Sequence, residues 1–290
     1  MTILDALERA KKLRKTRDGS SPARADGAQA ARDEAGSSAI RREPVYVEPL
    51  APAPYAALER LEFDDEACIR HKILFTSGQL AETGQAAAAY RLMRSRVVHR
   101  FKGSSWSCIG ITSPGPGEGK TVTALNLAIS IAREKQRMVY LLDLDMRNPS
   151  VFESVGVQPP RTMSQFFTDS LAPASVLFAT SVENLVMAGN REAVAGASEL
   201  LASPRLEEFI EYVKRRSPGA LILADLPPVL STDEALVVAP RMDAMFLVVS
   251  EGITRRDALA RAVDVLADFP VPGLILNRSS EQLGGDYYGY

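Results

Sequence analysis

Short, unbroken apolar runs alternate with longer amphipathic stretches over the second half of the chain. Runs such as Leu221–Leu223 and Met245–Val249 lack the apolar/polar alternation of a half-exposed strand. Continuous apolar runs suit strands that are covered on both faces, and therefore a mostly parallel sheet. Strands are expected at Ser107–Thr112, Met138–Leu142, Leu185–Met187, Ala220–Ala224, Ala244–Val249 and Gly273–Leu276.

Helical periodicity fills the intervals between these runs. Helices are expected over residues 85–101, 120–135, 204–216, 232–239 and 254–268. Ser203 and Pro204 open one of them as a cap followed by a first-turn proline. Alternating strands and helices imply right-handed crossovers and a doubly wound α/β sheet. Ligands of such sheets bind at the carboxyl ends of the strands.

The N-terminal region has a different pattern. Residues 2–16 predict an amphipathic helix, and six of the nine residues from Arg9 to Arg17 are basic. This helix, assigned to residues 1–17, is either a solvated terminus or a docking element for a partner or an anionic membrane surface. Residues 18–55 are rich in Gly, Ser, Ala and Pro and predict a flexible linker. Residues 56–83 are mixed and give no clear assignment.

Composition excludes several classes of protein. With 34 basic and 36 acidic residues, the formal net charge is −2, which does not indicate nucleic-acid binding. No apolar run is long enough for a membrane span, and the acidic start lacks the features of a signal peptide. The only cysteines are Cys68 and Cys108, which fits a reducing cytoplasm, and with two histidines a zinc site is not expected.

A glycine-rich loop joins the strand expected at Ser107–Thr112 to the following helix. It reads Thr-Ser-Pro-Gly-Pro-Gly-Glu-Gly-Lys-Thr and ends at Thr121. Glycines let backbone N–H groups surround phosphates, Lys120 can reach the outer phosphates, and the Thr121 hydroxyl can bind Mg²⁺. Because Pro114 and Pro116 have no N–H, the phosphate nest is expected over Gly117–Thr121. The loop is therefore a phosphate-binding P-loop.

Acidic residues end two of the other expected strands. Asp143 and Asp145 end one, where alternation in an extended chain points both side chains the same way, and Asp225 ends another before Pro227 and Pro228. Mg²⁺ takes oxygen ligands and retains water, so one or two carboxylates beside the phosphates meet its needs. A third acid is then available to act on an incoming nucleophile. A metal-dependent glycosyltransferase would not need the P-loop, and the motifs of eukaryotic protein kinases are absent.

These motifs together identify a family resemblance. From about Gln85 to Tyr290 the chain resembles the bacterial tyrosine kinases of capsule and exopolysaccharide synthesis, which are P-loop enzymes unrelated to eukaryotic kinases. Ser113–Thr121, Tyr140–Arg147 and Leu221–Pro228 match the family's three motifs. The second motif beside the other two separates this group from most P-loop ATPases. The kinase domain is expected over residues 56–282, with a nucleotide-binding core at about 106–278.

The resemblance implies ATP and Mg²⁺ as cofactors and assigns roles to the site residues. Catalysis would depend on Lys120, Asp143, Asp145 and Asp225, with Asp143 accepting the tyrosine proton. Mg²⁺ would be held by Thr121, Asp225 and one of the Asp143/Asp145 pair, for which Asp143 is preferred. Arg147 could assist the phosphates or a subunit contact. The nucleotide would contact Gly117, Glu118, Gly119, Lys120, Thr121, Val122 and Asn277, with Asn277 near the adenine.

The family autophosphorylates a C-terminal tyrosine cluster. This chain has Tyr287, Tyr288 and Tyr290 in its tail, residues 283–290. The expected partners are a membrane adaptor of the polysaccharide chain-length regulator type, a phosphotyrosine phosphatase and further copies of the chain, but no nucleic acid. The expected location is cytoplasmic, at the inner face of the membrane through the adaptor.

One departure from the family concerns subunit packing. The family often carries Glu-x-x-Arg-x-x-Arg ahead of the P-loop, where it packs subunits into a ring. Arg91 and Arg94 match, but Ala88 replaces the glutamate. The main alternative function is a P-loop ATPase switch of the plasmid-partition or septum-positioning kind. That group usually has a lysine early in the P-loop, and none occurs in Ser113–Pro116. A third possibility is a protein that binds ATP only as a structural element.

Overall fold

The computed structural model describes residues 57–74, 84–102, 104 and 106–280. These residues belong to one compact unit of the chain, Pro49–Tyr290. The predicted N-terminal helix at 1–17, the linker at 18–55 and the tyrosine tail at 283–290 all lie outside the described residues. Their assignments remain predictions.

Eight strands of the described part form one mostly parallel sheet, in the order β1-β4-β5-β3-β6-β2-β7-β8. Only the β4–β5 pair is antiparallel among the described pairs. The strands are β1 (Arg60–Leu61), β2 (Cys108–Thr112), β3 (Val139–Asp143), β4 (Phe178–Thr180), β5 (Leu185–Ala188), β6 (Leu221–Asp225), β7 (Ala244–Ser250) and β8 (Gly273–Asn277).

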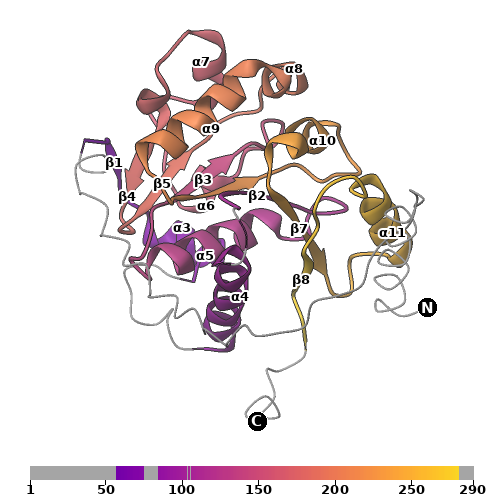
Figure 1. Ribbon diagram of the computed structural model, residues 1–290. Coiled ribbons are helices and arrows are strands. Elements are labelled where there is room, and N and C mark those ends of the chain that lie inside the picture. Colours follow the sequence, from indigo (N-terminus) through magenta and orange to yellow (C-terminus); the bar gives the residue numbers. More distant parts are fainter. Residues whose placement is uncertain (1–56, 75–83, 103, 105, 281–290) are drawn as a thin grey trace, which may run out of the picture. The chain divides into compact units, whose positions relative to one another are not determined.

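Helices connect the strands and lie on both sides of the sheet (Figure 1). The longer ones are α4 (Gln85–Lys102), α5 (Lys120–Ala132), α9 (Pro204–Arg216) and α11 (Arg256–Val265). The shorter ones are α3 (Asp65–Arg70), α6 (Val151–Ser154), α7 (Met163–Thr168), α8 (Ala197–Ala202) and α10 (Glu234–Val238), with 3₁₀ turns η2 (Pro173–Val176) and η3 (Ala239–Arg241).

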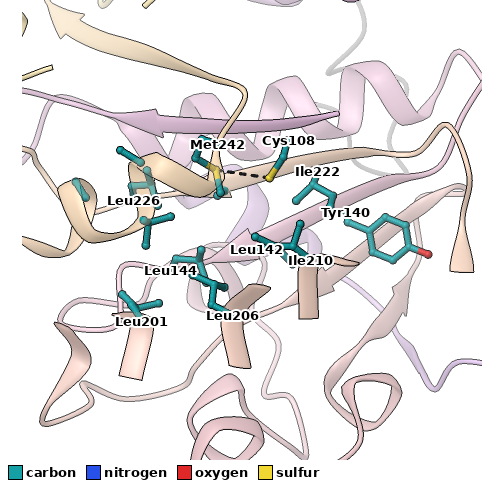
Figure 2. Packing of buried hydrophobic residues seen from close by; sticks show 14 of the residues in the cluster. Cys108, Tyr140, Leu142, Leu144, Leu201, Leu206, Ile210, Ile222, Leu226 and Met242 are labelled. Atoms are coloured by element: carbon teal, nitrogen blue, oxygen red, sulfur yellow. Dashed lines mark hydrogen bonds between the residues drawn. The ribbon is translucent and has the colours of Figure 1, made fainter. Parts of the chain in front are cut away.

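Alternate side chains of the central strands pack into two hydrophobic clusters, one on each face of the sheet. In β3, Tyr140 and Leu142 join the cluster that includes α9, while Val139 and Leu141 join the cluster that includes α4 and α5. Figure 2 shows part of the first cluster, where the Cys108 thiol lies 3.6 Å from the Met242 sulfur. Burial on both faces explains why these strands are continuous apolar runs.

The structure confirms the doubly wound α/β fold. All six expected strands are present, and α9 has the predicted bounds. The short strands β1 and β4 and the helices shorter than seven residues before β6 were not predicted, because they span too few residues for a periodic signal. Ser203 does precede α9, but its hydroxyl donates to Leu200 O at 2.6 Å, so its side chain does not cap the helix.

In the described part of the chain, no helix combines the length and apolar character needed to cross a bilayer.

Candidate active site

Three adjacent strands, β3, β6 and β2, end at the same edge of the sheet. Asp143 of β3 is the register partner of Asp225 in β6, and Asp225 is also the partner of Ile111 in β2. The P-loop follows β2 directly and leads into α5. The order of the strands therefore brings the acids of two motifs beside the loop of the third.

Lys120, at the first position of α5, is the cation of this cluster. Its ammonium lies 2.7 Å from Asp145 Oδ2 and 3.5 Å from Asp225 Oδ2. Burial alone would lower the pKa of Lys120, but the carboxylates of Asp225 and Asp145 outweigh burial and raise it. Lys120 therefore stays charged in a largely buried position.

Thr121 and Asp225 lie side by side beneath the P-loop. The Thr121 hydroxyl donates to Asp225 Oδ2 at 2.6 Å and accepts from the Ser150 hydroxyl at 3.2 Å. Asp225 is fully buried, and its Oδ1 has no hydrogen-bond partner. Burial raises the pKa of Asp225, while Lys120 and the Thr121 hydroxyl act in the opposite direction. A buried carboxylate oxygen without a partner beside a hydroxyl is a favourable place for a cation.

Asp143 is held by backbone N–H groups. Its Oδ2 accepts from Ser150 N at 2.9 Å and Val151 N at 3.0 Å, and its Oδ1 accepts from Asp145 N at 3.2 Å. Complete burial raises the pKa of Asp143 to about 8, and the charge of Asp225 adds to the rise. Asp143 is thus a carboxyl group that gains and loses a proton near neutral pH.

Asp145 faces the same side of the chain as Asp143, as strand alternation predicted. Although β3 ends at Asp143, Leu144 N donates to Asp225 O at 2.9 Å, and Leu142 and Leu144 lie in the same hydrophobic cluster, so the alternation continues through Asp145. Asn148 N donates to both the backbone carbonyl and Oδ1 of Asp145, at 3.2 and 3.1 Å, which fixes the turn. The alternation that was expected to bring Asp145 beside Asp143 is therefore present.

The P-loop closes against the end of β8. Asn277 Nδ2 donates to Glu118 O at 2.9 Å. Gly119 has φ +87°, and a methyl group on its Cα would lie 2.1 Å from Asn277 Nδ2, so only glycine fits. Asn277, predicted near the nucleotide, therefore contacts the loop directly. Gly117 has φ +75°, and Val122 is half-buried on α5.

Other residues singled out in the sequence occupy distinct places. Arg147 lies beyond Asp145 and pairs with the fully buried Glu234 of α10. Arg91 is exposed on α4. Arg94 Nε lies 2.8 Å from Glu134 Oε1, and its Nη1 donates to Ser130 O at 3.1 Å. Arg94, predicted to pack subunits, thus joins α4 to α5 within the chain.

Sequence reasoning missed two contributors to the site. Ser150 lies three residues after the second motif and had no assigned role, although its backbone N–H donates to Asp143 and its hydroxyl donates to the Thr121 hydroxyl. Glu234 follows the third motif, and only its pairing with Arg147 reveals a function. A short polar segment after a motif acid is the signal that could have pointed to Ser150.

The donors fit Mg²⁺ that is shared with phosphates. Among the residues that the structure describes, no three His, Cys, Asp or Glu side chains are arranged to hold a metal by themselves. Mg²⁺ usually needs only one or two carboxylates when phosphates and water complete its shell. The free Oδ1 of Asp225 and the Thr121 hydroxyl meet that requirement.

A strand–glycine loop–helix unit with Lys120 and Thr121, faced by acids from two neighbouring strands, defines a nucleotide-binding P-loop NTPase. Residues 106–281 match the ParA family model, described as NUBPL iron-transfer P-loop NTPase, and the chain belongs to this family.

Several individual relatives have names that state a more specific activity than the family description does. The chain is 28% identical over 214 residues to tyrosine-protein kinase YwqD of Bacillus subtilis (strain 168), covering 69% of this chain and 85% of the relative. The BceF tyrosine kinase domain is 28% identical with a TM-score of 0.57, covering 64% of this chain and 75% of that domain. The kinase domain of Escherichia coli tyrosine kinase ETK has a TM-score of 0.63 at 19% identity, covering 83% and 99%, which supports the fold.

Proposed function

We propose that the chain is an ATP-dependent protein-tyrosine autokinase that regulates exopolysaccharide or capsule polymerisation and export. The observation that carries the proposal is the convergence of Lys120, Asp145 and Asp225 within 3.5 Å at the P-loop, with Asp143 beside them. The similarity to curated tyrosine-protein kinases such as YwqD supports the choice of tyrosine as acceptor.

Each side chain has a definite task in this proposal. Lys120 supplies the positive charge for the outer phosphates of ATP. The backbone N–H groups of Gly117–Thr121 donate hydrogen bonds to the remaining phosphate oxygens. Thr121 and Asp225 would hold Mg²⁺, which supplies charge neutralisation on the phosphates when bound. Asn277, on the opposite side of the loop, contributes to the adenine end of the site.

Asp143 is the residue best suited to accept the tyrosine proton. A phenol has a pKa of about 10, so a base whose own pKa is close to the working pH is efficient. The pKa of Asp143 is raised to about 8 by burial, whereas Asp145 is already paired with Lys120 at 2.7 Å. Asp145 therefore positions Lys120, and Asp143 takes the proton.

The acceptors are Tyr287, Tyr288 and Tyr290 of the tail. Each phosphate adds about −1.5 to −2 charges, which would repel the tail from a site that contains three acids. Assembly of the homo-oligomer would then depend on phosphorylation, with a phosphatase restoring the tail. A membrane adaptor of the chain-length regulator type would recruit the chain to the inner face of the membrane.

Two other functions are less favourable. Partition or septum-positioning ATPases share the fold but usually carry a lysine early in the P-loop, and Ser113–Pro116 has none. Iron transfer, named in the family description, needs clustered cysteine ligands. The chain has only Cys68 and Cys108, which are buried in the clusters on opposite faces of the sheet.

Mass spectrometry of the purified full chain after incubation with Mg-ATP tests the proposal. We expect phosphate on one or more of Tyr287, Tyr288 and Tyr290, and none in Lys120→Met. ATP hydrolysis with no phosphotyrosine would instead identify an ATPase switch. A second measurement compares the oligomer mass before and after phosphatase treatment, and an unchanged mass would contradict phosphorylation-controlled assembly.

A further inference from the structure

The two edges of the sheet carry charges of opposite sign. Asp143, Asp145 and Asp225 gather at the carboxyl edge, beside the P-loop. The amino edge receives the connections that follow α4, α5 and α9, and these lead into the adjacent strands β2, β3 and β6. A helix dipole favours cations near the C-terminus of each helix. Here three such helix ends meet at one edge of the sheet.

Backbone contacts bring the ends of α5 and α9 together. Leu221 N donates to Met138 O at 2.9 Å, where Met138 precedes β3 and Leu221 begins β6. Arg137 is therefore next to the segment that follows α9. The last turn of α9 carries Lys214 and Arg215.

The end of α4 lies at the same edge. Arg94 contacts Ser130 O in the last turn of α5 and Glu134 just beyond it. Arg96 and Arg100 follow Arg94 on α4, and both are exposed. β2, which follows α4, pairs with β6, and β6 lies between β2 and β3. Since neighbouring strands are about 4.8 Å apart, the three helix ends surround the start of β6.

We call this surface the basic end and define it by Arg96, Arg100, Arg137, Lys214 and Arg215. Four of these residues, all except Lys214, form no ion pair with another described residue. Three of those four are exposed, and Arg137 is half-buried. The basic end therefore presents positive charge that nothing in the described part of the chain neutralises.

The acids beside the basic end are already matched. The ion pairs are Arg94–Glu134, Lys135–Glu183 and Lys214–Glu211, at 2.8, 2.5 and 3.4 Å. Asp243, which precedes β7, accepts from the backbone N–H groups of Ser107 and Cys108. Asp264 and Asp268, at the end of α11, lead into β8, two strands beyond β2. These acids leave the positive charge of the basic end in place.

We propose that the basic end docks directly on the anionic headgroups of a membrane, with the carboxyl edge and its acids facing away from the lipid. Charges from three separate connections suit a lipid surface, which presents many anions without fixed positions. An acidic peptide would need a groove, whereas the cavity lined by Arg147 and Asp233 belongs to the carboxyl edge.

A second feature of the chain favours lipid over nucleic acid. The helix predicted at residues 1–17 is amphipathic as well as basic, which is a signal for a membrane surface. Two weak membrane signals together give stable attachment. Docking of this kind needs no adaptor, no ATP and no tail, so it goes beyond the proposed kinase function and does not depend on it.

Vesicle flotation with the purified full chain tests the proposal. The probes are vesicles of phosphatidylglycerol and phosphatidylcholine in equal amounts, and vesicles of phosphatidylcholine alone. The test variant Arg100→Gln/Arg137→Gln/Arg215→Gln removes one charge from each of the three helix ends. A second test variant, Arg137→Gln/Lys214→Gln/Arg215→Gln, leaves α4 unchanged, which separates lipid contact from packing of α4 against a second copy.

The matched control removes three exposed charges at the carboxyl edge. It is Arg191→Gln/Arg256→Gln/Arg278→Gln, whose residues follow β5, begin α11 and follow β8. Each basic residue at an anionic surface is worth about a five-fold change in the partition coefficient. Both test variants should therefore lose about ten-fold or more in binding to the anionic vesicles, while the control loses less than about two-fold.

We expect the unmodified chain to bind the anionic vesicles, not the neutral ones, and to dissociate near about 1 M salt, where screening acts within about 3 Å. Equal binding to the two kinds of vesicle, or full binding by either test variant, would overturn the proposal. An equal loss in the control would also overturn it, because net charge alone would then decide binding. Double-stranded DNA is a further probe: DNA binding that the test variants lose, without vesicle binding, would identify nucleic acid as the partner instead.

Discussion

Asp143 and Asp225 are register partners at the carboxyl ends of the adjacent parallel strands β3 and β6, and both are fully buried. Two carboxyl groups in one dry site cannot both ionise without a cation, because like charges raise each other's pKa. Lys120 supplies one charge, and its ammonium contacts Asp225 and Asp145. Burial, together with the charge of Asp225, raises the pKa of Asp143 to about 8 and keeps it protonated until mildly basic pH.

The first prediction concerns the pH dependence of activity. The pKa of Asp143 is raised to about 8 by burial, so the fraction of Asp143 able to accept a proton grows as the pH increases through that value. Autophosphorylation rates measured at saturating Mg-ATP should rise from about pH 7 to 9. Asp143→Asn should lower the rate by about 100-fold and abolish this rise. An unaltered pH profile in Asp143→Asn would show that another group is the base.

The same carboxyl group links stability to pH with the opposite sign. In the unfolded chain an aspartate has a pKa of about 3.9, so between that value and about 8 the folded state holds a proton that the unfolded state has lost. The free energy of unfolding from this group is highest below the unfolded pKa and falls as the pH rises through the folded one. Urea unfolding should show Asp143→Asn gaining stability relative to the unmodified chain between pH 5 and 9.

A third prediction separates the charge of Lys120 from its catalytic role. Lys120→Met leaves Asp145 and Asp225 without their cation, which should lower the free energy of unfolding by about 3 kcal/mol at pH 8. Adding Asp145→Asn removes one of the unmatched carboxylates and should recover part of that loss. Neither variant should phosphorylate the tail. Recovery of activity in the double variant would mean that Lys120 is needed only for folding.

The fold was predictable because its signals are long and redundant. Six apolar runs and the helices between them fixed the class of sheet, and strand ends carrying Asp143 and Asp225 indicated the ligand edge. Contacts between segments distant in sequence left no such signal. The pairing of Arg147 with Glu234 crosses 87 residues, and that of Asn277 with Glu118 crosses 159. Neither residue type nor spacing specifies such a partner.

The closure of the P-loop on β8 gives a fourth prediction. Gly119→Ala places a methyl group against Asn277 Nδ2 at a backbone φ of +87°, which an alanine rarely adopts. We expect the affinity for ADP, measured with a fluorescent analogue, to fall by about ten-fold or more, since strain of this kind costs about 1–3 kcal/mol. Adding Asn277→Ala relieves the clash but not the backbone strain, so it should restore the affinity only in part. Full affinity in Gly119→Ala alone would contradict this account.

The final prediction tests whether Arg94 contacts residues of its own chain or a neighbouring copy. The resemblance places it in subunit packing, yet in the structure its guanidinium joins Glu134 and the Ser130 carbonyl on α5. Arg94→Ala and Glu134→Ala should each lower the free energy of unfolding by about 1 kcal/mol, and the double variant should lose less than the sum because the pair is coupled. Arg96→Ala, at an exposed position on the same helix, is the matched control and should leave the stability within about 0.5 kcal/mol. Mass photometry on the same four variants then measures the mass of the oligomer that each one forms. A loss of oligomer in Arg94→Ala that is absent in Glu134→Ala would show that Arg94 leaves Glu134 to contact a neighbouring copy, whereas equal losses of stability with unchanged mass identify an intrachain clamp between α4 and α5.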